Sequence, residues 1–500
     1  MSWSAPAILL ALLFGSAGQV AGQGYRVRFD ARLQSVAFRG VELDSIAASS
    51  AVVGSGGGLE TPDGIAVRCL TGANQCTFFR PGATQRAGPT TTVADMTLWG
   101  LGVRGLRVRA NARLGVDLGD SGTWPGTDPA AQLVEGYAEY STARVTAQVG
   151  RTNVVSRFGF KGFDGAKVIV RPTDHRLSVS AFGGWALARG VALPVTSPAL
   201  NPLDDFQPGQ RHIVWGGGAT WSSALVEARA RYRREFDSRT TDVSSERVAL
   251  TAAVRPGLGL TLAGGADYDI AAGYWGSAEV QISATRFNGR GSATAGVRRY
   301  RPHFDLWTIW GAFSPVAYRA AFAALRARPW AGFEIRARGE IYEFEDANAA
   351  TPLVTVEDDG WRWSVDGVYS RSSQWSISAG WHRALGPGAG SLGYRSAVVW
   401  SPSTQWVVSV NGSMLERPLE FRFNDAKVWV YGADVRYAPS TRLRFGVSAT
   451  RYDENRRRPD AAQFDWNQLR LNVTASVMLS SADVGLHPAI LSIPKRRVFR

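Results

Sequence analysis

Apolar and polar residues alternate with a period of two over long segments of the chain. In 106–118 the even positions are apolar or small, while the odd positions are mostly charged or polar, with arginine the most frequent. Successive side chains of a strand point to opposite faces, so this segment has one apolar and one polar face. It is longer than the usual strand of about five or six residues, and long enough to cross a membrane at a tilt. Segments 25–34, 224–233 and 333–341 alternate in the same way.

Short and long connections between these segments also alternate. The short ones are expected near 104–105, 141–144, 172–175, 221–223, 255–258, 288–290, 328–331, 370–373, 401–404 and 438–441. The longer ones are expected near 39–90, 119–131, 153–163, 188–209, 236–243, 270–273, 302–315, 346–356, 386–391, 416–423 and 455–463. Such alternation is typical of the periplasmic turns and outer loops of a transmembrane barrel.

This pattern predicts an all-β fold, an antiparallel transmembrane β-barrel of about 22 strands, within a range of 18–24. The barrel must close, because an open sheet edge in hydrocarbon leaves backbone groups without hydrogen bonds, at several kcal/mol each. Many tryptophans fall near expected strand ends, as in the aromatic girdles of such barrels. Segment 305–313 could itself be a strand, but counting it would break the even parity, so we assign it to an outer loop.

Residues 1–22 carry no charged side chain and hold a short apolar core at 7–14. The core is too short for a membrane helix and suits a signal peptide cleaved before Gln23, with a retained anchor as the alternative. We therefore expect a signal peptide at 1–22, a barrel at 23–479 and a periplasmic tail at 480–500. Together these features resemble the bacterial outer-membrane β-barrel superfamily, porin-like in the broad sense, and the resemblance implies a Gram-negative outer-membrane location.

Charge and motif content limit the chemistry that this chain can perform. The net charge is +14, but the basic residues recur along strands and form no single patch, which argues against a nucleic-acid partner. The five histidines lie in different elements without metal-ligand spacing, and no G-x-S-x-G motif occurs. We therefore expect no enzyme activity, no metal and no cofactor.

The first long connection, 39–90, contains the only two cysteines, Cys69 and Cys76. In an exported protein a disulfide is the natural interpretation, with free thiols or a metal or redox role as alternatives. A glycine-rich stretch at 55–58 makes this segment flexible. It is a candidate plug for the lumen, although the sequence leaves open whether it folds inward or projects outward.

Arginines dominate the polar parity of the strands and are the candidate selectivity residues, because rings of arginine favour anions in pores. They are Arg26, Arg28, Arg32, Arg107, Arg109, Arg113, Arg229, Arg231, Arg233, Arg336 and Arg338. The resulting hypothesis is an outer-membrane channel for small polar or anionic solutes, in contact with lipid and lipopolysaccharide. The alternative is a structural or interaction barrel that sheaths or anchors a partner protein or a surface assembly at the outer membrane, with the partner in its lumen or on its periplasmic side.

Overall fold

The computed structural model describes residues 24–54, 57–70, 72, 74–119, 131–172, 176–187, 212–238, 241–286, 288–301, 317–345, 359–370, 372–386, 389–417, 426–456 and 466–481. Twenty-two antiparallel strands form the barrel wall. They are β1 (Gly24–Ala47), β6 (Pro89–Trp99), β7 (Leu106–Asp117), β8 (Ala131–Ser141), β9 (Val145–Ser156), β10 (Gly159–Val170), β11 (Leu177–Ala186), β12 (His212–Ser222), β13 (Val226–Asp237), β14 (Val243–Gly257), β15 (Leu260–Asp269), β16 (Tyr274–Arg286), β17 (Gly291–Tyr300), β18 (Tyr318–Ala327), β19 (Phe333–Phe344), β20 (Asp359–Tyr369), β21 (Trp375–Gly386), β22 (Ala389–Trp400), β23 (Trp406–Arg417), β24 (Ala426–Tyr437), β25 (Leu443–Arg456) and β26 (Trp466–Ser480).

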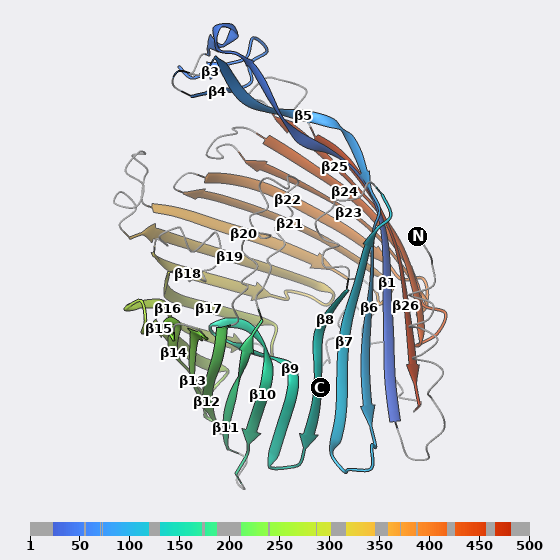
Figure 1. The fold of residues 1–500 in the computed structure, drawn as a ribbon. Coiled ribbons are helices and arrows are strands. Elements are labelled where there is room, and N and C mark those ends of the chain that lie inside the picture. Colours follow the sequence, from blue (N-terminus) through green and yellow to red (C-terminus); the bar gives the residue numbers. More distant parts are fainter. Residues whose placement is uncertain are drawn as a thin grey trace.

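The wall closes where the first strand meets the last. On one side β1 pairs with β26, with Arg26 opposite Ser480, and on the other it pairs with β6, with Arg26 opposite Thr97. The strands from β6 to β26 pair consecutively around the ring (Figure 1). No helix among the described residues is long and apolar enough to cross a membrane.

The two faces of the wall are reversed relative to a water-soluble protein. Large apolar side chains such as Val116, Ile282 and Val447 are exposed on the outer face, each more than half accessible. Charged side chains such as Glu235, Asp267 and Arg247 are buried on the inner face. An apolar outside and a polar inside are what a lipid-embedded barrel requires, and the alternation in the sequence follows from this.

Eight of the ten predicted short turns are confirmed, each lying between consecutive strands at one end of the barrel, whereas those at 172–175 and 370–373 include residues outside the described ranges. The β16–β17 turn contains Asn288 and Gly289, both with positive φ, the conformation that a tight hairpin turn demands. Three predictions of a longer loop are wrong: 39–90, described below, 386–391, where β21 and β22 stay paired up to Gly386 and Ala389, and 153–163. Instead of a loop at 153–163, β9 and β10 continue to a two-residue tip, because their backbones stay paired up to Ser156 and Gly159. Segment 305–313 lies outside the described residues, as do 1–22 and most of the C-terminal tail.

The segment 39–90 is largely a β-hairpin rather than a loop. The second half of β1 pairs with β5 (Gln75–Ala87) and continues beyond the barrel rim (Figure 1). We call this hairpin, with the chain between its strands, the arm. That chain holds η1 (Ala48–Ser50), β2 (Val52–Val53), β3 (Leu59–Glu60) and β4 (Arg68–Cys69). Of the two positions that the sequence left open, the arm adopts the outward one. The Cys69–Cys76 disulfide is confirmed and ties β4 to β5.

Candidate functional site

The β9–β10 hairpin bends inward across the inner face of the neighbouring strands (Figure 1). Its contacts reach progressively farther along the wall. Phe163 is fully buried, with its ring centroid 5.3 Å from that of Phe182 on β11. Lys161 Nζ lies 2.7 Å from Glu235 Oε1 on β13, and both side chains are at least nine-tenths buried. The hairpin therefore narrows the lumen along one side.

At the tip of this hairpin, Phe158 lies beside two arginines of the wall. Arg233 on β13 is directly opposite Arg247 on β14, an arrangement in which two like charges repel. The guanidinium carbons lie 5.4 and 5.0 Å from the centroid of the Phe158 ring. The negative face of an aromatic ring attracts such cations, so Phe158 helps to hold the two guanidiniums together and is itself held at the wall.

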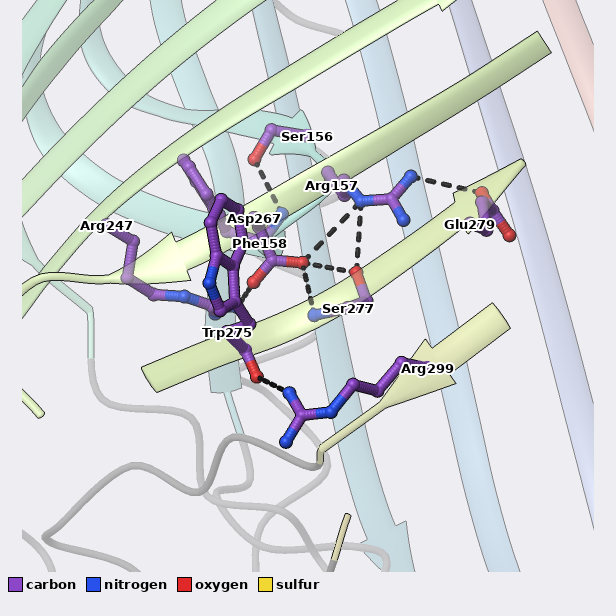
Figure 2. A network of polar contacts seen from close by, with 9 residues as sticks. All are labelled: Ser156, Arg157, Phe158, Arg247, Asp267, Trp275, Ser277, Glu279 and Arg299. Atoms are coloured by element: carbon purple, nitrogen blue, oxygen red, sulfur yellow. Dashed lines mark hydrogen bonds and ion pairs between the residues drawn. The ribbon is translucent and has the colours of Figure 1, made fainter. Parts of the chain in front are cut away.

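The other tip residue, Arg157, reaches β15 and β16 (Figure 2). Its guanidinium donates to Ser277 Oγ at 3.0 Å and to Glu279 Oε1 at 3.1 Å, and lies 3.5 Å from Asp267. Asp267 is almost fully buried, forms an ion pair with Arg247 and accepts hydrogen bonds from the backbone and hydroxyl of Ser277. A buried carboxylate is stable only when paired and hydrogen-bonded, and Asp267 meets both conditions.

Two glycines leave the space that this network occupies. A Cβ built on Gly276 would lie 2.2 Å from Asp267 Oδ2, and one on Gly265 would lie 3.0 Å from Arg157 Nη1. Any larger residue at Gly276 would displace the carboxylate that organises the tip. We call Arg157, Phe158, Lys161, Arg247 and Asp267, with the residues that they contact, the tip network.

The eleven predicted arginines lie on the luminal face of three separate wall segments. Strands β1 and β7 carry Arg26, Arg28, Arg32, Arg107, Arg109 and Arg113. Strand β13 carries Arg229, Arg231 and Arg233, and β19 carries Arg336 and Arg338. Only Arg233 joins the tip network, and the structure does not gather the set into one ring. Arg231 contacts Ser180 and Thr220, and Arg32 donates to Asn472.

Away from the tip network, several luminal ion pairs share an asymmetry, in which the arginine is exposed while its carboxylate partner is buried. Arg107 is 52% exposed and its partner Glu139 is 6% exposed. Arg336 and Arg338 are 56% and 54% exposed, whereas Glu334 and Glu340 are 11% and 1% exposed. Solvent in the lumen therefore meets the guanidiniums more than the carboxylates.

Sequence reasoning missed Arg157, Phe158, Lys161 and Asp267. One signal was available, since Phe163 is a large apolar residue on the luminal parity of β10, where a water-filled lumen would favour a polar one. Among the described residues there is no group of three or more His, Cys, Asp or Glu side chains that could hold a metal ion.

Comparison with known proteins gives structural neighbours only. No protein-family model and no curated protein matches the sequence. Solved structures that align include a BenF-like porin from Pseudomonas fluorescens Pf-5, with 9% identity, a TM-score of 0.39, and coverage of 91% of this chain and 99% of the porin. OpdK of Pseudomonas aeruginosa, solved with vanillate, aligns with 10% identity, a TM-score of 0.38, and coverage of 91% and 98%. OccAB1 of Acinetobacter baumannii aligns with 8% identity, a TM-score of 0.36, and coverage of 93% and 98%.

The assignment to a membrane therefore depends on this chain's own features. The wall is a closed ring, so that lipid meets no open sheet edge. Its outer face is largely apolar and its inner face charged, and most of its connections alternate between short turns and longer segments. The chain is an integral, closed β-barrel of the outer-membrane type.

Proposed function

We propose that the barrel is a passage for small polar solutes across the outer membrane, with a preference for anions. The asymmetry of the luminal ion pairs carries this proposal. Buried carboxylates keep the arginines in place, while the exposed guanidiniums set the potential that a solute encounters. Arginine-lined pores favour anions for the same reason.

The β9–β10 hairpin supports a passage rather than a sheath. It covers the inner wall from β11 to β16, which is surface that a protein enclosed by the barrel would use. An inward-folded element that narrows one side is compatible with the passage of small solutes along the opposite wall. The exposed arginines of β7 and β19 lie on strands that the hairpin contacts do not reach.

The test is the reversal potential of the purified protein in a planar bilayer with asymmetric KCl. The informative variant combines Arg109→Gln, Arg336→Gln and Arg338→Gln. The carboxylates that pair with Arg336 and Arg338 keep other hydrogen-bond donors. Glu334 also contacts Arg326 and Arg328, and Glu340 also contacts Arg298 and Arg362. Asp95 still accepts a hydrogen bond from Asn111, and Glu135 from Asn153. This choice avoids leaving a buried charge unpaired.

We expect the wild type to prefer chloride, and the triple variant to lose several-fold of that preference in 0.1 M salt. The difference should shrink in 1 M salt, because the screening length falls from about 10 Å to about 3 Å. A matched control neutralises Arg234, Arg383 and Arg451, which have the outward parity of their strands. Equal loss in both triple variants, or a silent bilayer, would contradict the proposal.

A further inference from the structure

A cavity of about 230 Å³ on the luminal wall is lined by Arg157 and by residues of strands β13 to β16. Its shape follows from the register of these strands. Arg229, Thr251, Gly265 and Glu279 lie opposite one another in one cross-strand row. This row places long polar side chains on β13 and β16 and small ones on β14 and β15, which lie between them. The small central residues form the floor of a trough.

The second row repeats this arrangement next to the first. It runs from Glu227 on β13 through Ala253 and Ala263 to Gln281 on β16. Three strand spacings, roughly 14 Å between backbones, separate the two ends, and the long side chains reach inward from both. The cavity has room for roughly eight atoms the size of a water molecule, at about 30 Å³ each.

The two ends of the trough carry opposite charges that are accessible. At the β13 end Arg229 is 56% exposed and donates to Glu227, which also pairs with Arg255 at 3.2 Å. At the β16 end Glu279 is 41% exposed, and Arg157 contacts its Oε1 atom. The trough therefore presents a guanidinium excess at one end and an accessible carboxylate at the other.

We infer that this trough, which we call the wall subsite, binds a small zwitterion with a carboxylate and an ammonium at opposite ends of a short chain. The solute carboxylate pairs with Arg229, and the ammonium pairs with Glu279. The small floor residues Ala253 and Ala263 accommodate the methylene groups between them. A simple anion would gain only the first contact. This inference deepens the proposed passage by naming a class of solute, and it rests on that proposal.

The experiment uses three probes that differ only in their charged ends, namely 5-aminopentanoate, pentanoate and pentylamine. Binding to the detergent-solubilised barrel is measured by titration calorimetry, and block of the current is measured in bilayers. We expect the zwitterion to bind at least tenfold more tightly than either probe with one charge, since each of those probes lacks one of the two charge-assisted contacts.

Variants locate the site. Arg229→Gln and Glu279→Gln should each weaken zwitterion binding about tenfold or more, and Arg229→Gln should leave pentylamine unaffected. Arg395→Gln is the matched control, because Arg395 is a well-exposed arginine on the distant strand β22, where it pairs with Asp366. Equal affinity for pentanoate and the zwitterion, or equal loss in the control, would overturn the wall subsite while the passage remained. Calorimetry also reports on the subsite if the bilayer is silent, so the two proposals can fail separately.

Discussion

The buried Lys161–Glu235 pair should be the main attachment of the inward hairpin to the wall. Its atoms are 2.7 Å apart, and the two side chains are 9% and 0% exposed. Removal of one member of a buried pair costs about 3–5 kcal/mol, because the remaining charge stays buried without its partner. Lys161→Met keeps a similar length and volume, so packing changes little. We expect it to lower the free energy of unfolding by that amount, unless the hairpin detaches first.

The alternative to global destabilisation is local opening, which would let water from the lumen reach Glu235. In that case the stability loss is limited to the free energy of opening, and the channel becomes wider. Urea unfolding in lipid vesicles, followed by tryptophan fluorescence, measures the first quantity. Single-channel conductance measures the second. In Lys161→Met, either the free energy of unfolding or the single-channel conductance must change.

The double variant Lys161→Met with Glu235→Met provides the matched control. Replacing both members of a buried pair with apolar residues of similar volume is often neutral or stabilising. We therefore expect the double variant to recover most of the stability lost in Lys161→Met, with a coupling energy of about 2 kcal/mol or more. The reasoning is refuted if Lys161→Met changes unfolding by less than about 1 kcal/mol and also leaves the conductance unchanged.

Three further predictions concern the tip, the arm and the rim. Arg157→Ala should raise single-channel conductance by releasing the tip from Asp267, Ser277 and Glu279, whereas Arg144→Ala in an exposed turn should not. The double variant Cys69→Ser with Cys76→Ser should lower the local stability of the arm by roughly 2–3 kcal/mol. A protease should then cleave the arm faster, while the conductance stays unchanged. Cleavage at the wild-type rate would contradict this prediction. Hydrogen bonding from Arg299, opposed by partial burial and reinforced by Arg319, lowers the pKa of Glu345, just beyond β19, to about 2. Because the folded pKa lies below the usual 4.5, this stabilisation should be lost as pH falls from about 4.5 to 2. In the wild type the loss should appear as faster hydrogen exchange at the rim. The Glu345→Gln variant should show no such pH step.

The sequence was sufficient to predict the wall because one physical constraint acts on every strand. Lipid favours an apolar side chain at most outward positions, so the alternation repeats from β1 to β26 and the short turns interrupt it clearly. The disulfide was also predictable, since two cysteines close in an exported chain have few alternatives.

The tip network could not be predicted in the same way. Lys161 and Glu235 are 74 residues apart, and Arg157 and Glu279 are 122 residues apart. Their contacts depend on the number of strands between them and on the inward bend of β9 and β10, which no local pattern records. The parity of the arginines can be read from the sequence, but their carboxylate partners cannot, because pairing depends on the register between strands. Which guanidinium is exposed and which carboxylate is buried follows from that register.

The closure of the barrel at β1 and β26 has a consequence for biogenesis. Tyr25 and Ser481, which hydrogen-bond across this seam, are 456 residues apart, whereas every other pair of wall neighbours is joined by a local hairpin or by the arm. Bringing such distant segments together costs roughly 3 kcal/mol more chain entropy than closing a ten-residue hairpin. Pairing of β1 with β26 should therefore be the last step of barrel formation, after the C-terminal strand has been exported. Until then the two unpaired strand edges can pair with the wrong strand or with another chain. Folding of this barrel should therefore depend on a periplasmic chaperone.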